Sequence, residues 1–461
     1  MTIDATRRRR ILGFCLVLVG CMFFGVRGYH DQKLALQSFD FKPVYSSTRC
    51  LIDGCDPYDS VQIEQEYLQH GGDGSDLRPF RPFNANYPPS ALFLVIPLAL
   101  LPFEVARAIW LCIGIVLFSC AALCVADLCV GRRALWAQGL LAVFVVSSTM
   151  LIMLGQPAMF AISLAVIGAW SFLRQRWLAL GVVAFAVSLT FKPHDGGLIW
   201  LFFLLSAGGA AVVGSSAARG RVARGVSFRR LALYTLAAAI VLLTPGVLLA
   251  FHHPASAHWP QELHTNLVGI AAHGQASDPG PTNGEVQSIA SLQAVFALVH
   301  DVPRFYNLTA YATFLPLFLA WLYLVVRRGR GVARQRVDED GRDGVSDADL
   351  MALAAAAALS FLPIYHRQYD TRLLLLMFPA VAVLASGYRW MGRAAIVLSG
   401  VAIVAMSHQF VHLGPLLVRR GVRLPGAAWL LFFRPLPLML LLLSCFFLYG
   451  MFVAGGKERN G

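Results

Sequence analysis

Long apolar segments alternate with short polar connectors along almost the whole chain. The apolar segments lie near residues 11–28, 87–103, 105–129, 134–153, 157–173, 177–191, 195–214, 231–251, 308–326, 350–364, 371–388, 393–411 and 434–454. Most of them approach the roughly 20 residues that an α-helix needs to cross the hydrocarbon core of a bilayer. Because a spanning segment must pair its backbone polar groups internally, this pattern predicts an all-α polytopic membrane protein.

The composition narrows the class of protein further. Of the 461 residues, 57% are hydrophobic and 14% are charged, whereas a soluble domain carries about 25% charged residues. These values exclude a water-soluble globular enzyme, a disordered regulator and a fibrous protein. The sequence contains no evident internal repeat, Walker motif or Rossmann glycine fingerprint, so nucleotide binding is not expected. We expect a single membrane domain over residues 1–461.

The basic residues indicate how the chain is threaded through the membrane. The net charge is +13, and most arginines lie in short connectors: Arg7–Arg10, Arg132–Arg133, Arg174–Arg176, Arg219–Arg230 and Arg327–Arg336. This distribution follows the positive-inside rule, and it favours membrane lipid rather than nucleic acid as the partner of these charges. All of these connectors are cytoplasmic only if one apolar segment does not cross.

Segment 87–103 is the one that we expect not to cross, because it is short and rich in proline, as re-entrant or interfacial elements are. About twelve spanning helices then remain, with both termini and the charged connector 327–349 in the cytoplasm and with loops 29–86 and 252–305 outside. The first apolar segment, Ile11–Val26, lacks a convincing signal-peptide cleavage site, so we expect a retained anchor. Four arginines lie outside against the rule: Arg419, Arg420, Arg423 and Arg434.

Most polar residues with potential chemistry fall outside the membrane in this arrangement. The first is Asp40, which lies between Phe39 and Phe41 shortly after the first apolar segment. A carboxylate among aromatic rings near the membrane surface is partly desolvated, which raises its basicity and suits a general base. A helix-capping or solvated loop aspartate explains the same residue, and the sequence leaves both interpretations open.

The rest of loop 29–86 contains a second group of candidates. Asp56 and Tyr58 lie in one turn-forming stretch, and Asn86 and Tyr87 lie in another. Aromatic rings pack on the C–H faces of sugars while carboxylates and amides bond to hydroxyls, so this group suits a sugar. An aromatic belt at the membrane surface is the alternative.

The same loop contains Cys50 and Cys55. An extracytoplasmic loop permits a disulfide between them, whereas the small ring disfavours it. The sequence leaves the pairing open.

Two further outer connectors contain Gln156, Lys192 and His194. A lysine and a glutamine at the ends of spanning helices can bind the phosphate of a lipid. A lysine whose stem packs on apolar surface while its ammonium reaches water is the alternative.

The turn between two late spanning segments contains His366, Arg367, Asp370 and Arg372. Charged residues in a tight turn at the membrane are functional candidates by default. The two arginines suit a phosphate clamp, and the histidine suits proton transfer or a hydrogen bond to phosphate. A structural Arg–Asp pair is the alternative.

Loop 252–305 contains several histidines, but their spacing is irregular and HExxH is absent, so we expect no metal site there. The stretch Glu285–Leu292, which includes Gln287, reads as a short amphipathic helix at the interface.

The order and spacing of these motifs resemble glycosyltransferase family 87, also known as the DUF2029 membrane proteins, which includes polyprenol-phosphate-mannose-dependent mannosyltransferases. The resemblance covers most of the chain and rests on Asp40, Tyr45, Gly54, Asp56-Pro57-Tyr58, Tyr87-Pro88-Pro89, Gly155-Gln156, Lys192-Pro193 and Gln287-Ser288. Two places depart from the family pattern. Tyr365–Asp370 lacks the expected Trp- and His-containing sequence, and Pro157 follows Gln156.

The resemblance implies a GT-C fold with its active site on the extracytoplasmic face, here of the bacterial inner membrane. It implies a polyprenyl-phosphate sugar as donor, a lipid or glycan as acceptor, transfer of a mannose-like hexose, and no cofactor or metal. Asp40 matches the family's base, and His366 is the second catalytic candidate. The expected substrate-binding residues are Tyr45, Asp56, Tyr58, Asn86, Tyr87, Gln156, Lys192, His194, Gln287, Arg367, Asp370 and Arg372.

Two other functions stay open. A transporter or flippase of a lipid-linked sugar needs ionisable groups near the bilayer midplane and broken helices in matching halves. A GT-C ligase or polymerase transfers a glycan chain where a transferase adds one sugar.

Overall fold

The computed structural model describes residues 3–34, 38–75, 84–129, 131, 133–206, 226–331, 345–422 and 426–460. Within these ranges the secondary structure is helical, with one isolated β-bridge between Ile289 and Arg367. The expectation of an all-α protein is confirmed. Much of the charged connector 327–349 and of the basic stretch 219–230 lies outside the described residues, as do residues 76–83 of the first loop.

The helices range from three to 32 residues in length. The main helices of the bundle are α1 (Ile3–Leu34), α5 (Phe103–Leu128), α6 (Ala134–Val146), α8 (Ala158–Arg174), α9 (Leu178–Phe191), α10 (Pro193–Leu205), α11 (Phe228–His252), α14 (Pro303–Gly331), α15 (Asp347–Leu359), α16 (Met377–Gly387), α17 (Arg389–Ala405) and α21 (Pro435–Asn460). The others are α2 (Phe41–Asp53), α3 (Ser60–Gln69), α4 (Pro89–Ala99), α7 (Met150–Met153), η2 (Pro254–Ser256), α12 (Trp259–Ile270), η3 (Val286–Ser288), α13 (Gln293–Phe296), η5 (Asp370–Leu376), α18 (His408–Val411), α19 (Leu413–Arg419) and α20 (Gly426–Phe433).

Seven helical stretches are long and apolar enough to cross a membrane: Arg7–Asp31, Phe103–Leu128, Ala134–Met153, Phe228–His252, Pro303–Arg328, Asp370–Gly387 and Pro435–Gly455. They indicate a multi-pass membrane protein. Helices α8 and α9 are apolar but have 17 and 14 residues, so the count of twelve crossings stays a prediction. Segment 87–103 forms α4, an 11-residue helix, and the expectation that this segment does not cross stays a prediction.

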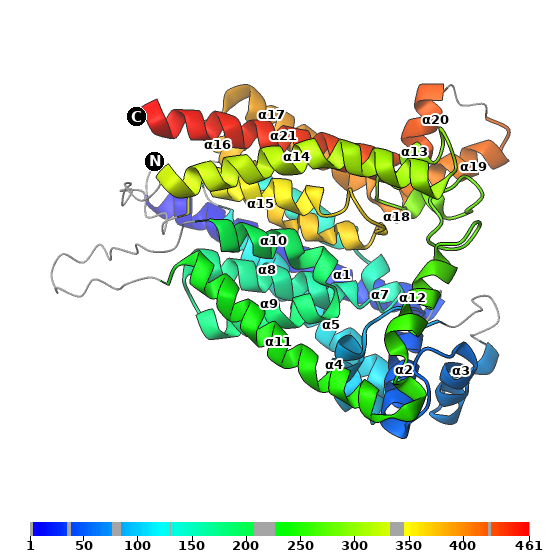
Figure 1. Cartoon of the computed structure of the whole chain (residues 1–461). Helices are drawn as coiled ribbons and strands as arrows, with labels where there is room; N and C mark the ends of the chain where they lie inside the picture. Colours follow the sequence, from blue (N-terminus) through cyan, green and yellow to red (C-terminus); the bar gives the residue numbers. More distant parts are fainter. Residues whose placement is uncertain are drawn as a thin grey trace, which may run out of the picture.

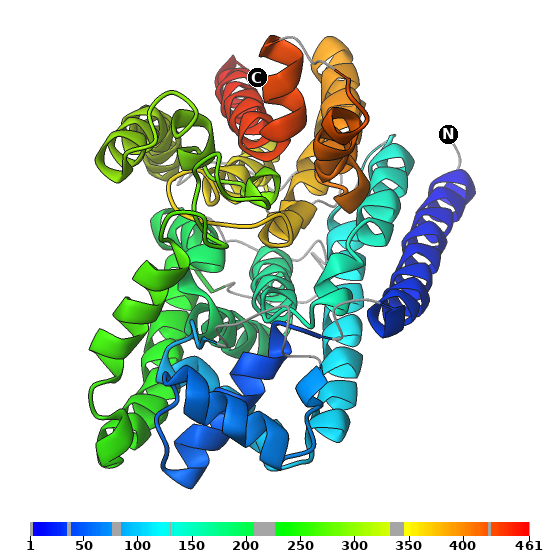
Figure 2. The same ribbon diagram turned by 90° about the vertical axis from the view of Figure 1, so that its right-hand side faces the viewer.

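The long helices run side by side and give the bundle two distinct ends (Figure 1). The N- and C-termini lie at one end, and α2, α3, α12 and α18–α20 lie at the other. In the view along the helices, α14 and the helices after it form one side of the bundle, while most of the helices from α2 to α11 form the opposite side (Figure 2). The two expected outer loops, 29–86 and 252–305, therefore meet at the end opposite the termini.

Helix α15 is buried on every side. Every residue from Leu350 to Leu359 is buried, and most of them are alanine or leucine. A helix that is apolar all round belongs in the interior, and small side chains allow its neighbours to approach closely. Helices α10 and α21 pack on it, and η5 is held against both α15 and α8. This packing places the start of η5 next to the start of α10.

Arg434, one of the four arginines that break the positive-inside rule, has a structural explanation. Its side chain is 1% exposed, and its Nε donates to the backbone oxygen of Ala294 at 2.5 Å. This bond joins the start of α21 to α13. Because the guanidinium is used inside the protein, its position reflects packing rather than topology.

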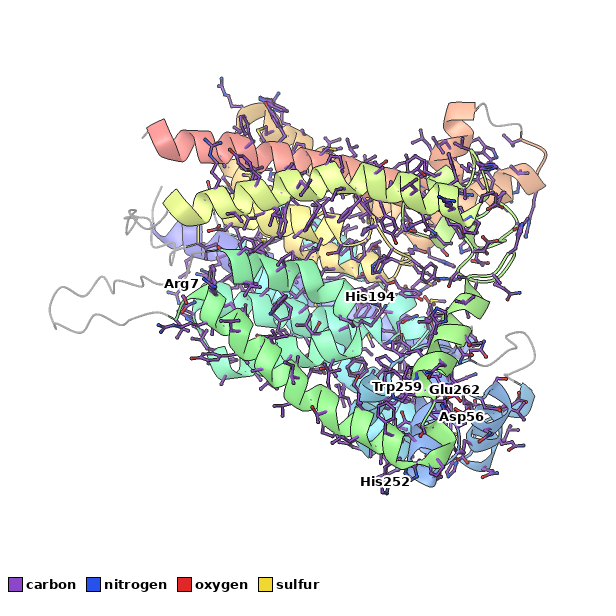
Figure 3. The ribbon with its side chains drawn as sticks, viewed as in Figure 1. Arg7, Asp56, His194, His252, Trp259 and Glu262 are labelled. Carbon is purple, nitrogen blue, oxygen red and sulfur yellow. A yellow bond between two sulfur atoms is a disulfide. The ribbon has the colours of Figure 1, made fainter. Side chains whose placement is uncertain are left out.

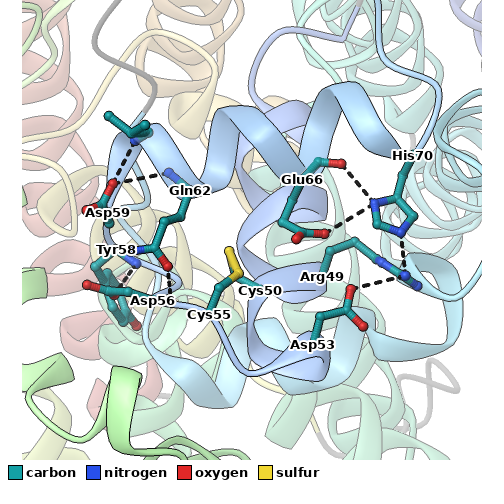
Figure 4. The surroundings of a disulfide bond; sticks show 11 residues. Arg49, Cys50, Asp53, Cys55, Asp56, Tyr58, Asp59, Gln62, Glu66 and His70 are labelled. Atoms are coloured by element: carbon teal, nitrogen blue, oxygen red, sulfur yellow. Dashed lines mark hydrogen bonds and ion pairs between the residues drawn. A yellow bond between two sulfur atoms is a disulfide. The ribbon is translucent and has the colours of Figure 1, made fainter.

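The first loop is stabilised by a disulfide between Cys50 and Cys55 (Figure 4), which settles the pairing that the sequence left open. Helix α2 ends there at Gly54, whose φ of +82° is a left-handed conformation that glycine adopts without strain. Helix α3 then begins after Asp59, whose carboxylate accepts hydrogen bonds from the N–H groups of Val61 and Gln62.

Candidate functional site

Asp40 lies immediately before α2 and is fixed by main-chain contacts to a distant loop. Its N–H donates to the carbonyl oxygen of Leu154 (2.8 Å), and the N–H of Ser38 donates to that of Met153 (3.0 Å). This close approach requires glycine at position 155. Gly155 has a φ of +61°, and an added Cβ would lie 2.7 Å from the Cβ of Ser38.

The side chain of Asp40 does not cap α2, which excludes the capping interpretation that the sequence left open. Its Oδ2 instead accepts a hydrogen bond of 2.5 Å from the Nε2 of Gln156. Asp40 as a whole residue is partly exposed. Gln156 thus orients the carboxylate and leaves its second oxygen available to another group.

The pKa of Asp40 is raised to about 6 because burial disfavours its charged form. The positive charge of Arg367, the hydrogen bond from Gln156 and the charge of Lys192 oppose this rise, while Asp370 adds to it. These interactions show that Asp40 shares one electrostatic environment with the connector between α9 and α10 and with the turn that leads into η5. A carboxyl group with such a pKa is mostly ionised at neutral pH yet still basic, as a general base requires.

Lys192, which joins α9 to α10, forms the centre of a buried ion network. Its Nζ lies 2.5 Å from Asp370 Oδ1 and 3.4 Å from Asp195 Oδ2. It also lies 5.8 Å above the ring of Tyr369. Burial alone would lower the pKa of Lys192, but the two carboxylates raise it above its usual value, so the ammonium remains charged.

His366 lies on the other side of the same carboxylates. Its Nδ1 is 3.4 Å from Asp195 Oδ1 and 3.5 Å from Asp370 Oδ2, and its ring centroid is 5.0 Å from that of His194. Burial lowers the pKa of His366 in spite of these carboxylates, so the neutral imidazole is favoured at neutral pH. His194 is more exposed and lies in the half of the bundle that faces the loop helices, well away from Arg7 at the terminal end (Figure 3).

The stretch that follows η3 holds the turn containing His366. The N–H of Ala290 donates to the carbonyl oxygen of His366 (2.8 Å), and the N–H of Gln368 donates to that of Ser288 (2.8 Å). Gln287 contributes to this local structure through a hydrogen bond from its Nε2 to the carbonyl oxygen of Gly284. Gln287 is nearly fully buried, so we assign it a role in supporting this stretch of backbone. The expected amphipathic helix at Glu285–Leu292 is, in the structure, the three-residue helix η3 followed by the extended Ile289.

Arg367 and Tyr87 border the network where it is partly exposed. The Nε of Arg367 donates to the hydroxyl of Tyr365 (2.5 Å), and its NH2 group donates to the carbonyl oxygen of Ala276 (2.5 Å). Burial raises the pKa of Tyr87, and Lys192 opposes that rise, which places the tyrosine hydroxyl near the lysine. A guanidinium has five N–H donors, so Arg367 retains donors for an anionic ligand.

Two expected substrate-binding residues lie in closed surroundings. Tyr45 is fully buried, and its hydroxyl donates to the carbonyl oxygen of Leu101 (2.6 Å). Arg372 is also fully buried, and it donates to the carbonyl oxygen of Met406 (2.8 Å) while its guanidinium covers the ring of Phe144. The structure gives both side chains packing partners rather than contact with the ion network.

Asp56, Tyr58 and Asn86 form a second group beneath α12. Tyr58 donates to the carbonyl oxygen of Tyr87 (2.9 Å), and Asn266 of α12 donates to the carbonyl oxygens of Tyr58 (3.1 Å) and Ala85 (3.2 Å). The labelled side chains of Asp56, Trp259 and Glu262 lie close together there (Figure 3). Tyr58 therefore connects this group to Tyr87 at the border of the ion network.

Sequence reasoning missed Asp195 and Tyr369 as site residues. Asp195 lies three residues after Lys192 at the start of a predicted helix. This spacing, which allows the two side chains to meet, is the sequence signal that could have identified Asp195. Tyr369 has no comparable signal, since only its contact with Lys192 distinguishes it from the other aromatic residues near the membrane.

Comparison of the chain with protein-family models gives no match, and comparison with curated proteins and with solved structures gives none either. The function must therefore be inferred from the site itself and from the family resemblance of its motifs.

Proposed function

We propose that this protein is a membrane glycosyltransferase of the GT-C type, related to family 87. It moves a hexose from a polyprenyl-phosphate sugar to a lipid or glycan acceptor at the end of the bundle that carries the loop helices, on the periplasmic face of the bacterial inner membrane. One observation carries the proposal: a basic carboxylate, Asp40, lies in the same electrostatic environment as Arg367 and Lys192. Glycosyl transfer from a lipid phosphate needs this combination of a base and cations.

Asp40 acts as the general base. With Gln156 on Oδ2, the other carboxylate oxygen takes the proton from an acceptor hydroxyl while the hydroxyl oxygen bonds to the anomeric carbon. The bond between that carbon and the phosphate oxygen breaks on the opposite face, and polyprenyl phosphate leaves with the electron pair. The anomeric configuration is therefore inverted.

Arg367 is the better of the two expected phosphate ligands. Its remaining N–H donors suit bidentate bonding to phosphate, and its guanidinium is partly exposed. Lys192 is already paired with Asp370 at 2.5 Å and is 7% exposed. Its main effect is a fixed positive potential, which stabilises the charge that develops on the leaving phosphate.

The group beneath α12 suits the acceptor or the sugar. The group combines the aromatic ring of Tyr58 with the polar side chains of Asp56 and Asn86. Asn266 attaches α12 to it through hydrogen bonds to backbone carbonyl oxygens. This cover excludes water from the path between the group and Asp40, which limits hydrolysis of the donor.

The experiment compares donor use by the wild-type protein and two arginine variants in proteoliposomes. A radiolabelled polyprenyl-phosphate sugar is supplied with membrane lipid acceptors, and the labelled product is separated from free sugar. Arg367→Ala should raise the KM for the donor about tenfold or more. Arg304→Ala is the matched control, because Arg304 is exposed at the start of α14 and outside the site.

The wild-type product distinguishes the possible reactions. One added sugar supports the transferase, a transferred chain indicates a ligase or polymerase, and movement of the donor across the bilayer without turnover indicates a flippase. Equal effects of the two arginine substitutions would reject the phosphate role of Arg367.

A further inference from the structure

Two histidines and one aspartate beside Lys192 have the spacing of a metal site. His194 Nε2 is 3.7 Å from Asp195 Oδ1, His366 Nδ1 is 3.4 Å from the same oxygen, and all three atoms lie within 4.8 Å of one another. Ligand atoms around a tetrahedral ion with bonds of about 2.1 Å are about 3.4 Å apart. The cluster is therefore close to metal-binding geometry before any side chain moves.

Several of these polar side-chain atoms lack hydrogen-bond partners among the described residues. Asp195 and His366 are both 0% exposed. Neither carboxylate oxygen of Asp195 and neither ring nitrogen of His366 forms a hydrogen bond with a described residue, although Lys192 lies 3.4 Å from Asp195 Oδ2 as an ion pair. Buried polar atoms without hydrogen bonds are unfavourable, and a cation between them would satisfy both side chains.

The charge of the site gives a second argument for a cation, and this argument rests on the proposed function. The carboxylates of Asp40, Asp195 and Asp370 outnumber the cations of Lys192 and Arg367. The donor phosphate would bring further negative charge beside the carboxylates of Asp195 and Asp370. A divalent cation held there would offset that charge and so favour an anionic donor.

The donor set selects the class of metal. Two imidazoles with one carboxylate suit Zn²⁺ and similar transition-metal ions, whereas Mg²⁺ and Ca²⁺ prefer sites made of oxygen atoms. Three protein ligands leave a fourth position open, as in catalytic zinc sites. His194 and Asp195 directly follow Pro193 at the start of α10, so a rigid helix end positions two of the three ligands.

Against the absence of a metal that the family resemblance implies, we propose that His194, Asp195 and His366 bind one divalent transition-metal ion of the Zn²⁺ class, and that its open position accepts an oxygen of the donor phosphate. The ion then shares the neutralisation of the phosphate with Arg367. The carboxylate of Asp370 lies beside His366, at 3.5 Å, and offsets part of the added positive charge.

The test measures metal binding directly. The full-length protein in detergent is treated with EDTA, freed of the chelator and titrated with Co²⁺, whose visible absorption reports imidazole and carboxylate ligation. One Co²⁺ per chain should bind and be displaced by Zn²⁺. His194→Ala and Asp195→Asn should each raise the dissociation constant at least tenfold.

The matched control is His70→Ala. His70 belongs to another acidic cluster with Asp53 and Glu66, but there the guanidinium of Arg49 already pairs with it (Figure 4). We expect this variant to bind Co²⁺ as the wild type does. If Asp195→Asn does not fold, His194→Ala decides the question, because its side chain is 39% exposed and tolerates truncation.

The proposal is overturned if the wild-type protein gives no Co²⁺ absorption, or if His70→Ala loses the signal while the other two variants keep it. Sugar transfer is measured on the same preparation with and without EDTA. Transfer that continues at the wild-type rate without any bound metal would reject the proposed role of the ion in holding the donor phosphate and leave the glycosyltransferase intact. Metal binding without transfer would support the site and reject the proposed function.

Discussion

Replacing Asp40 by asparagine tests the proposed base most directly. The substitution keeps the shape of the side chain and its contact with Gln156 but removes the acceptor of the proton. General-base catalysis contributes about 10²–10⁴-fold to a rate, which corresponds to about 3–5 kcal/mol of barrier. We therefore expect the rate of sugar transfer to fall by at least about 100-fold.

The pH profile gives the same residue an independent signature. With a pKa of about 6, Asp40 is mostly ionised at pH 7 and mostly protonated at pH 5. For wild-type protein, kcat/KM should therefore decline about tenfold for each pH unit well below 6. An aspartate of ordinary pKa would show no such decline above pH 5.

Stability should change in the opposite direction from activity. The folded-state pKa of Asp40 is raised above its ordinary value, so protonation favours the folded protein and the charged form opposes folding at pH 7. Asn mimics the neutral form, and the Tm of Asp40→Asn should equal or exceed that of wild type. Loss of activity with a retained Tm separates catalysis from misfolding.

The assay combines initial rates from a radiolabelled polyprenyl-phosphate sugar between pH 5 and pH 8 with thermal unfolding of each purified variant. Asp59→Asn is the matched control, because Asn caps a helix as well as Asp does and Asp59 caps α3. Its rate and Tm should match the wild type. The role of Asp40 as general base is contradicted if Asp40→Asn retains more than about a third of the wild-type rate, or if its Tm falls together with its activity.

Three further substitutions test the structure around the site by thermal unfolding. Gly155→Ala should lower stability by about 1–3 kcal/mol, because its φ is +61° and the new Cβ would meet Ser38 at 2.7 Å; an unchanged Tm would show that the loop adapts. Arg372→Met should lower the Tm and leave the KM for the donor within about twofold, since the guanidinium bonds to buried carbonyl groups; a large rise in KM at constant Tm would make it a phosphate ligand after all. Cys50→Ser, which removes the bond to Cys55, should cost about 2 kcal/mol by loop-closure entropy, and reduction of the wild type should match it.

Much of the fold could be predicted because it depends on local sequence. The length and hydropathy of each segment determine whether it forms an apolar helix, and the proline-rich segment 87–103 indeed forms only the short helix α4. The number of membrane crossings was harder to predict, because α8 and α9 are too short to be assigned as spanning helices by length alone. Whether a short apolar helix crosses depends on its neighbours and not on its own residues.

The candidate site, like the fold, could be predicted from the sequence only in part. Asp40 and Lys192 could be singled out because a charge among apolar residues near a membrane is costly. The sequence did not distinguish a capping aspartate from a base, since the difference lies in the hydrogen bond to Gln156. Arg372 resembled Arg367 in the sequence, but its side chain points into packed surroundings.

The hydropathy of the chain is enough to identify a helical membrane protein whose polar candidate residues lie in a few connectors, because hydrophobic length is a property of each segment alone. Which of those polar side chains meet depends on how the helices pack. Lys192 and Asp370 are 178 positions apart in the chain and 2.5 Å apart in space. The packing of η5 against α8 and α15 brings them together, and side-chain direction within that packing is a long-range property that no single motif contains.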